Sequence, residues 1–481
     1  MPKSNSVDFT KQARKLVADD LPLQFEPNSF TIRGAQLNRS TQLKNNQVFI
    51  MDDDRFLTLK QSLQTVQEIE ELISFLESQE TFSFPPLNNG LFPAAIAHES
   101  TGYQSIWVRD NIHIAHALYA IGKMESACQA MSTLTDYFIK HRDRFDDMIS
   151  GKTHPKEIMK RPHIRFDGTT LGEIDEKWAH AQNDALGYFV WLYSLLALQE
   201  KLTPTQESLE LMAAFVCYFE KIRFWEDADS GHWEEARKVE ASSIGTAVAG
   251  LKMLQQYLDQ SQTWSHFKLG KKSVPPELLD DLIQQGQLTL AQILPAECIQ
   301  PDPLQARKYD AALLFLIYPL GLVEGEMAET IMEDVRIHLM GDYGIRRYLG
   351  DSYWCADYKD ILGEDDRTSD FSEDQASRDQ LLKPGEEAQW CIFDPILSVI
   401  YGQRFLRSEK SEDYERQRFH LDRALNQITT HDSIFGAYRC PESYYLEKGQ
   451  YVPNDITPLL WTQANLMMAL HQWKQTVAAR R

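Results

Sequence analysis

Apolar side chains recur at three- and four-residue spacing along most of the chain from residue 57 onward. That spacing places them on one face of an α-helix, because an α-helix turns once every 3.6 residues. Loops that carry Gly, Pro or Asp separate these segments and mark where each helix ends. The pattern predicts twelve helices, at 57–78, 110–121, 125–141, 184–200, 205–221, 241–258, 277–288, 307–320, 324–339, 388–406, 413–430 and 458–476.

The predicted helices tend to alternate between a more apolar member and a more amphipathic one. Segment 184–200 is almost entirely apolar, whereas segment 205–221 is amphipathic. A helix that is apolar all round is buried, and an amphipathic helix covers it. Six such pairs indicate an all-α fold, an (α/α)6 toroid in which six inner helices are wrapped by six outer helices. An α-solenoid is the alternative, but a solenoid should show a repeated sequence period, and none is visible.

Two stretches do not follow the helical pattern. Residues 1–56 are mixed and polar, with short β-favouring segments at 29–32 and 48–51. They indicate a short irregular N-terminal arm, or a small strand pair, packed on a main domain of residues 57–481. Residues 357–387 are acidic and contain few apolar side chains. We interpret this second stretch first as a solvated loop, with a lid over a pocket as the alternative.

The composition and net charge of the chain argue against some classes of binding partner. The chain has 49 Lys and Arg against 70 Asp and Glu, a formal net charge of −21. Such a surface repels the phosphates of nucleic acids and anionic lipids, so we expect no nucleic-acid and no membrane partner. The N-terminus has no apolar signal region, and the six cysteines include no C-x-x-C pair. We therefore expect a cytoplasmic protein with reduced thiols.

Aromatic residues, carboxylates and arginines are concentrated in loops between the predicted helices, at 103–110, 178–184, 223–245, 343–353 and 440–445. This combination suits a sugar, whose C–H faces stack on aromatic rings and whose hydroxyls bind charged groups. The third loop contains two Trp-Glu pairs, ending at Glu226 and Glu234, and a carboxyl beside Trp is suited to act as a general acid. Each feature also has a structural explanation, since Asp110 and Asp184 are placed to cap helices.

Taken in order, five short motifs resemble family 15 of the glycoside hydrolases, the glucoamylase-like enzymes. They are W-x-R-D ending at Asp110, W-x-x-x-Q-x-D ending at Asp184, G-x-W-E ending at Glu234, R-Y beginning at Arg347 and P-E-x-Y around Glu442. Segments such as 162–166 and 241–245 are similar to one branch of that family. This branch includes the N-terminal domain of phosphorylase kinase α and β subunits and related bacterial proteins.

The resemblance implies an (α/α)6 barrel that hydrolyses an α-glucosidic bond with inversion, with Glu234 as general acid and Glu442 as general base. Without the resemblance, Glu442 would be interpreted as a surface carboxylate that precedes a helix. Substrate-binding roles are implied for Tyr103, Trp107, Arg109, Asp110, Trp178, Gln182, Asp184, Trp233, Arg347 and Trp390. Asn183 stands where glucoamylases often carry an arginine, which leaves contacts beyond the first sugar open. Glycoside hydrolysis needs no cofactor, and the scattered histidines show no metal-ligand spacing.

Two functions follow from this resemblance. The first is an exo-acting hydrolase that releases β-glucose from the non-reducing ends of α-glucans or gluco-oligosaccharides. The sequence leaves open whether the linkage is α-1,4, α-1,6 or that of trehalose. The alternative is a non-catalytic glucan-binding regulatory module that acts on a protein partner, in the manner of the phosphorylase kinase α and β subunits.

Overall fold

The computed structural model describes residues 51–95, 105–300, 306–383 and 385–480. Most of the predicted N-terminal arm, residues 1–50, therefore lies outside the described residues. Its last part is not irregular, because the chain is helical from Met51 onward (α2, Met51–Ser62). Tyr103 also lies outside the described residues.

Six helices form an inner ring that closes on itself. Each inner helix contacts the next one around the ring, and α17 returns to contact α4. The inner helices are α4 (Val108–Ala120), α7 (Asn183–Leu198), α9 (Ala241–Ser261), α11 (Leu314–Ile317), α15 (Phe393–Ser408) and α17 (Leu460–Ala479). The closed ring confirms the predicted toroid and excludes the solenoid alternative.

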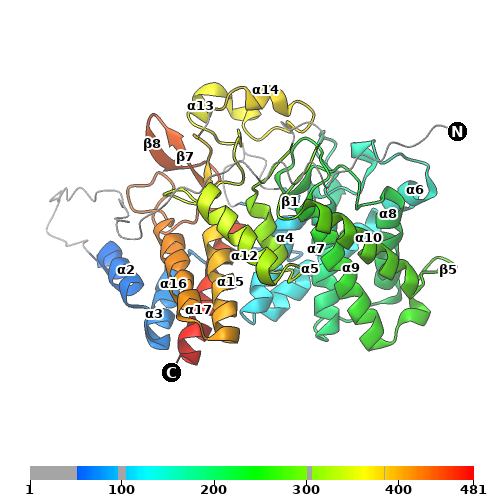
Figure 1. Cartoon of the computed structure of the whole chain (residues 1–481), viewed down its shortest axis with the longest axis horizontal. Coiled ribbons are helices and arrows are strands. Elements are labelled where there is room, and N and C mark those ends of the chain that lie inside the picture. The colour runs from blue at the N-terminus through cyan, green and yellow to red at the C-terminus, as the bar shows by residue number, and fades with distance from the viewer. Residues whose placement is uncertain (1–50, 96–104, 301–305, 384, 481) are drawn as a thin grey trace.

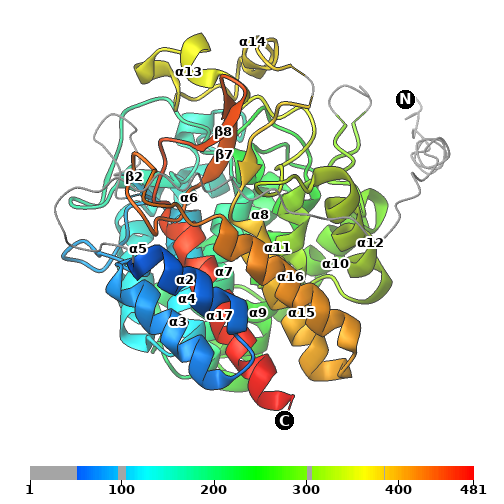
Figure 2. The same ribbon diagram turned by 90° about the vertical axis from the view of Figure 1, so that its left-hand side faces the viewer.

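Six further helices lie outside this ring, each against an inner helix. Figures 1 and 2 show, for example, α16 beside α15 and α3 beside α17. The outer helices are α3 (Val66–Ser78), α5 (Met124–Lys140), α8 (Gln206–Ile222), α10 (Pro276–Ile293), α12 (Gly325–Asp334) and α16 (Ser411–Asn426).

The burial of each helix follows its hydrophobic pattern. Nearly every residue of α7 is buried, whereas α3 buries one face that includes Leu72 and Phe75. The inner helices α7 and α9 approach closely at two glycines. A Cβ on Gly187 would lie 2.7 Å from the backbone nitrogen of Ala247, and one on Gly250 would lie 2.6 Å from the carbonyl oxygen of Gly187. Larger side chains would therefore separate these two helices.

Several predicted elements differ from the structure. The predicted helix 57–78 is two helices, because α2 ends at Ser62 and Thr65 caps the start of α3 in a capping box with Glu68. The predicted helix 307–320 is reduced to a 3-10 turn, η5 (Ala311–Leu313), followed by the single turn of α11. The predicted helix 324–339 ends in a π-helical turn, η6 (Val335–Leu339). A short helix, α6 (Asp143–Ser150), was not predicted.

Three small antiparallel sheets also lie after the predicted arm, where no strands were expected. The first contains β1 (Ile106–Trp107), β2 (Arg165–Asp167) and β3 (Gly172–Glu173); the second, β4 (Lys268–Leu269) and β5 (Lys272–Ser273); and the third, β6 (Gln389–Trp390), β7 (Ser443–Glu447) and β8 (Gln450–Pro453). Strands of two to five residues are too short to give a readable alternation. Strand β6 occupies the start of the predicted helix 388–406, so α15 begins only at Phe393.

One end of the ring carries most of the irregular structure. Strands β7 and β8 lie at this end beside two short helices, α13 (Tyr358–Ile361) and α14 (Gln375–Asp379) (Figures 1 and 2). Segment 357–387, which contains both short helices, is called the lid below.

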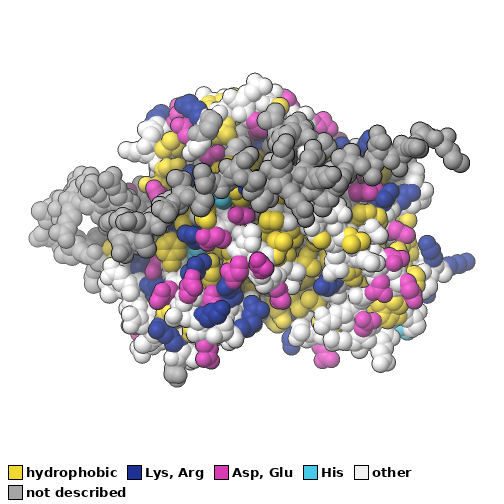
Figure 3. Space-filling model, viewed as in Figure 1, with side chains coloured by type: hydrophobic (Ala, Val, Ile, Leu, Met, Phe, Trp, Pro, Cys, Tyr) yellow, Lys and Arg dark blue, Asp and Glu magenta, His cyan; other side chains and the backbone are white. Residues whose placement is uncertain are grey.

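The charged side chains on the surface are of both signs, as the composition of the chain indicates. Acidic and basic side chains are interspersed over the helices on the face drawn in Figure 3. Among the described residues, no helix combines the length and the apolar character needed to cross a membrane.

Candidate active site

A cavity of about 370 Å³ opens at the end of the ring that carries the lid. Residues from several elements line it: the start of α4, the turn before α9, strand β6, the residue before β7, the start of α17 and the lid. Nine of the predicted site residues are among them: Trp107, Arg109, Asp110, Trp178, Trp233, Glu234, Arg347, Trp390 and Glu442. Residues far apart in the sequence therefore meet in one place, as predicted.

Two predicted substrate-binding residues, Gln182 and Asp184, do not line the cavity but hold Arg109 from behind. The Arg109 Nε donates to Asp184 Oδ2 at 2.6 Å, and its Nη2 donates to Gln182 Oε1 at 2.5 Å and to the Gly231 carbonyl at 3.0 Å. Both side chains are buried, and their predicted substrate-binding role stays a prediction. The guanidinium itself is fixed and faces the cavity.

The helix-cap explanations for the two aspartates are also wrong. Helix α4 begins after Trp107, and α7 begins after Gln182, so neither aspartate occupies a cap position. Asp110 lies at the cavity beside Arg109 instead. Burial raises the pKa of Asp110 to about 7, although the charge of Arg109 lowers it.

Glu234 follows the 3-10 turn η3 (Gly231–Trp233), where its φ of 58° turns the chain into the left-handed region. Its side chain is 19% exposed, and its Oε1 lies 3.6 Å from Arg109 Nη1. Burial raises the pKa of this carboxyl above its usual range, and Arg109 opposes the shift. The neighbouring Trp233 is fixed by its indole N–H, which donates to Asp310 at 3.0 Å. A raised pKa is the property that a general acid needs.

Glu226, the carboxylate of the other Trp-Glu pair, has a different environment. Its side chain is 51% exposed and pairs on the surface with Arg223. It does not line the cavity.

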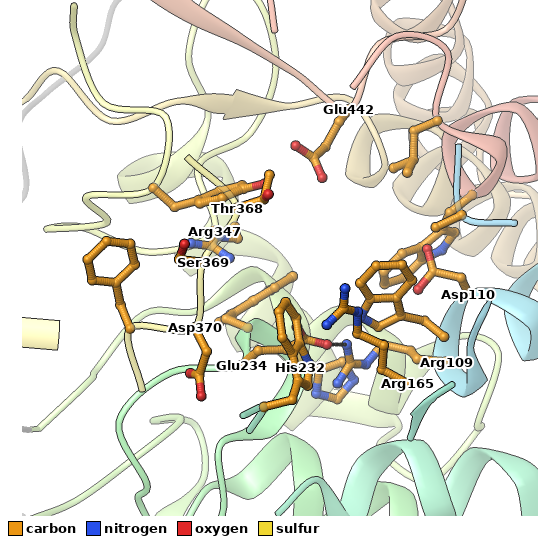
Figure 4. Close-up of a pocket in the computed structure, with 18 of the residues that line it drawn as sticks. Arg109, Asp110, Arg165, His232, Glu234, Arg347, Thr368, Ser369, Asp370 and Glu442 are labelled. Atoms are coloured by element: carbon orange, nitrogen blue, oxygen red, sulfur yellow. Dashed lines mark ion pairs between the residues drawn. The ribbon is translucent and has the colours of Figure 1, made fainter. Parts of the chain in front are cut away.

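Glu442 lies across the cavity from Glu234, and both carboxyl groups face the space between them (Figure 4). The residue is only 2% exposed, so it is not a surface carboxylate. Its backbone N–H donates to the Ile456 carbonyl at 3.0 Å, and its carbonyl accepts from Cys391 at 2.9 Å. The side-chain amide of Asn454 donates to Glu442 Oε2 at 2.5 Å. An amide donor of this kind stabilises an ionised carboxylate.

Arg347 is held on the cavity wall by charges and aromatic rings. Its Nε and Nη2 each donate to Asp351 at 2.6 Å, and its guanidinium lies 4.9 Å from the ring centroid of Trp390 and 5.1 Å from that of Trp233. Glu235 accepts a further bond from it at 3.3 Å. Such a group keeps its position when a ligand enters.

Glu235, next to Glu234 in sequence, is buried and does not line the cavity. It accepts hydrogen bonds from Arg307 at 2.8 Å and from Arg378 of the lid at 3.2 Å, as well as from Arg347. These cations hold the pKa of Glu235 well below its usual range, although burial opposes the shift. The surroundings of the two adjacent carboxyls thus shift their pKa values in opposite directions.

The lid covers part of the cavity, so the interpretation as a simple solvated loop is wrong and the lid alternative describes the structure. Lid residues Thr368 to Phe371 line the cavity. Arg378 is 6% exposed and fastens the lid to Glu235. The acidic composition of the lid gave no indication of these contacts.

Other lining residues were not predicted as site residues: Ala94, Arg165, Glu176, His232, Tyr353, Leu459 and Trp461. Two of them had a signal, because Arg165 lies in the P-H-I-R-F segment and Trp461 in a P-L-x-W motif. In the part of the chain that the structure describes, no group of three or more His, Cys, Asp or Glu side chains is placed to hold a metal ion.

Comparison with known families explains this arrangement. The family model "Glycosyl hydrolases family 15" matches residues 78–365, more than half of the chain. The chain belongs to this family. The matched residues include Glu234 but end before Glu442.

Curated relatives of this chain include the probable phosphorylase b kinase regulatory subunit alpha of Caenorhabditis elegans. It is 26% identical over 390 residues, which cover 74% of this chain and 30% of the relative. The rabbit skeletal muscle isoform of the same subunit is 26% identical over 292 residues, covering 55% of this chain and 22% of the relative. This chain therefore spans less than a third of the length of these relatives.

Solved structures share the fold at low sequence identity. A wild-type glycosidase has a TM-score of 0.58 at 16% identity, with 87% of this chain and 97% of that chain covered. The glucoamylase from Saccharomycopsis fibuligera has a TM-score of 0.53 at 12% identity, with 84% of this chain and 95% of that chain covered. At such identities the likeness shows the fold alone.

Proposed function

We propose that this chain is an inverting, exo-acting α-glucoside hydrolase that releases β-glucose from the non-reducing ends of α-glucans or gluco-oligosaccharides. The observation that carries the proposal is the pair of carboxyl groups, Glu234 and Glu442, that face one cavity from opposite sides (Figure 4). An inverting glycosidase needs two such groups, with room for a water molecule beside one of them.

The surroundings of the two groups support separate roles. Glu234, whose pKa burial raises, donates its proton to the glycosidic oxygen as the bond to the leaving group breaks. Glu442, which accepts from Asn454, takes a proton from the water that attacks the anomeric carbon from the opposite face. The product therefore has the inverted, β configuration.

The remaining walls suit a sugar ring. Trp107, Trp178 and Trp390 offer apolar faces for the C–H surfaces of the ring, while Arg109 and Arg347 offer fixed donors for its hydroxyls. Arg109 and Asp110 are each less than a tenth exposed, and in this proposal they form the deep part of the cavity, which receives the terminal glucose. An exo-acting enzyme needs a deep part that receives only a chain end.

Glu234→Gln and Glu442→Gln test the proposal. Each variant is expected to reduce glucose release by at least about 10³-fold while thermal unfolding stays cooperative, because the amide can neither donate nor accept the required proton. Maltotriose, isomaltose and trehalose serve as substrates, and NMR identifies the anomer released. Full activity in either variant, or release of α-glucose, contradicts the mechanism.

The names of the curated relatives favour a second function, because they are regulatory subunits. In that case the cavity binds a glucan end without hydrolysing it, and binding is communicated to a protein partner. This alternative predicts that the wild-type chain binds maltotriose or isomaltose in calorimetry but releases no glucose. Stoichiometric glucose release from either sugar excludes it.

A further inference from the structure

Two oppositely charged side chains line the cavity, and neither was expected there from sequence. Arg165 comes from strand β2, and Asp370 comes from the lid. Arg165 is only 7% exposed. The guanidinium lies 4.1 Å from the ring centroid of Trp178 and 5.2 Å from that of Trp107, so its plane is fixed by aromatic packing.

Each of the two side chains has a polar atom whose partner the protein does not supply. Arg165 Nη1 donates to Glu176 at 2.7 Å, but the buried Nε has no hydrogen-bond partner among the described residues. Asp370 Oδ1 accepts from the Ser372 backbone at 2.8 Å, but the buried Oδ2 likewise has no such partner there. Because buried polar atoms in native proteins are normally hydrogen-bonded, one donor and one acceptor remain for a ligand.

Both side chains lie close enough to Glu234 for their charges to act on its carboxyl group. In Figure 4, Asp370 lies on the same side as Glu234, and Glu442 lies across from both. After burial, the charge of Arg109 and a side-chain hydrogen bond with Gln182, the charges of Arg165 and Asp370 also act on the pKa of Glu234, the first lowering it and the second raising it. A general acid protonates the glycosidic oxygen, so the group that leaves must lie next to it.

We propose that Arg165 Nε and Asp370 Oδ2 bind hydroxyl groups of the leaving sugar and thereby determine which leaving group the site accepts. This proposal rests on the proposed function and names the subsite that accompanies it. The hydroxyl of a neutral sugar can both donate and accept a hydrogen bond, so it can use the donor on Arg165 and the acceptor on Asp370. Arg165 and Asp370 are therefore specificity-determining residues.

Binding measurements in a Glu234→Gln background test this proposal without requiring turnover. The amide at position 234 also removes any effect of the two charges on the general acid. Calorimetry measures the affinity for glucose and for one disaccharide. In this proposal glucose fills only the deep part of the cavity. The disaccharide is whichever of maltose, isomaltose and trehalose binds most tightly. Adding Asp370→Asn or Arg165→Lys is expected to weaken disaccharide binding about tenfold or more, because each change removes a charge-assisted hydrogen bond. Glucose binding is expected to change less than twofold.

A matched control comes from the same lid. Glu373 is 60% exposed and pairs on the surface with Lys177, so Glu373→Gln removes one lid charge without reaching the cavity. This control is expected to leave both affinities unchanged. Thermal unfolding of each variant shows that the lid and β2 remain folded.

The possible results are distinct. Equal weakening of glucose and disaccharide places the two residues in the deep part of the cavity and overturns the proposal. No weakening in either variant, or a disaccharide that binds no more tightly than glucose before the changes, also overturns it. Failure of the proposed hydrolysis shows separately, as absence of glucose release by the wild-type chain.

Discussion

The burial of Asp110 at the cavity makes the folded chain less stable as the pH rises toward neutral. Its pKa is raised to about 7 by burial. The folded chain therefore holds a proton on this group in a range, from about pH 4 to pH 7, where the unfolded chain has released it. Stability contributed by this group is consequently lost as the pH rises through that range.

Asp110→Asn is expected to remove this pH dependence. The free energy of unfolding of the variant, taken relative to that of the wild-type chain, is expected to be higher at pH 7 than at pH 4 by up to about 4 kcal/mol. Urea unfolding of the wild-type and variant chains between pH 4.5 and 7.5 measures the difference between the two curves. Other buried carboxyls titrate in both chains, so only this difference matters. Parallel curves for the two chains contradict the assignment. The same variant is expected to bind glucose more weakly.

Asp184 supports the site from below and is expected to matter more for stability. It is fully buried and pairs with Arg109 at 2.6 Å. Asp184→Asn leaves the guanidinium without its main counter-charge, and loss of one member of a buried pair costs about 3 to 5 kcal/mol. Chemical denaturation should show this loss. Glu226→Gln is the control, because its surface pair should contribute about 0.5 kcal/mol or less. Similar losses in the two variants would contradict the buried role of Asp184.

At the scale of elements, the contact between α7 and α9 depends on having no side chain at Gly187. A Cβ there would lie within 2.8 Å of three backbone atoms of α9, which belong to a helix that cannot move locally. Gly187→Ala is therefore expected to destabilise the fold by about 2 kcal/mol or more, despite the higher helix propensity of alanine.

Thermal unfolding measures this effect, with Gly363→Ala in the lid as the control. The nearest atom to a Cβ at Gly363 is Asp366 Oδ2 at 3.6 Å, an ordinary contact. The Gly363→Ala control is expected to unfold at the wild-type temperature. If Gly187→Ala also unfolds at that temperature, the result contradicts the close packing of the two helices.

The lid is an element whose role depends on a few buried contacts rather than on its overall composition. Arg378 reaches Glu235 below the cavity, and the backbone N–H of Ala236 donates to Gln375 at 2.9 Å. The acidic and polar surroundings of these residues dominate the sequence of the lid, which is why a solvated loop was expected.

At the scale of the whole molecule, the ring is closed by its last helix. Helix α17 contacts both α15 and α4, and the Trp473 indole donates to the Leu63 carbonyl at 2.8 Å. Removing residues 460–481 leaves Glu234 and Glu442 in the chain but opens the ring. The truncated chain is expected to lose cooperative unfolding, because the inner faces of α4 and α15 would lose their cover.

Circular dichroism during heating checks this expectation, with a chain ending at residue 479 as the control. The control keeps all of α17 (Leu460–Ala479) and should unfold as the full chain does. If the chain without residues 460–481 unfolds cooperatively at the temperature of the full chain, the ring does not fold as one unit.

The sequence by itself determined the helices and their division into two layers. Helical periodicity is a local property, so segments such as α7 and α8 could be recognised without knowledge of their neighbours. The same local pattern indicated the pairing of inner and outer helices, and hence the toroid. It could not show elements whose stability is not local, such as the two-residue strands β1 and β6 or the single turn of α11.

The candidate site was only partly determined by sequence. The motifs identified the loops that carry Glu234 and Glu442, but these residues are more than two hundred positions apart, and only closure of the ring brings them to one cavity. Tertiary structure also decided that Gln182 and Asp184 hold Arg109 by hydrogen bonds, and that Arg165 and Asp370 line the same cavity as Glu234. The reason is physical: burial, pKa and hydrogen bonding depend on neighbours in space, and a helical period contains no information about those neighbours.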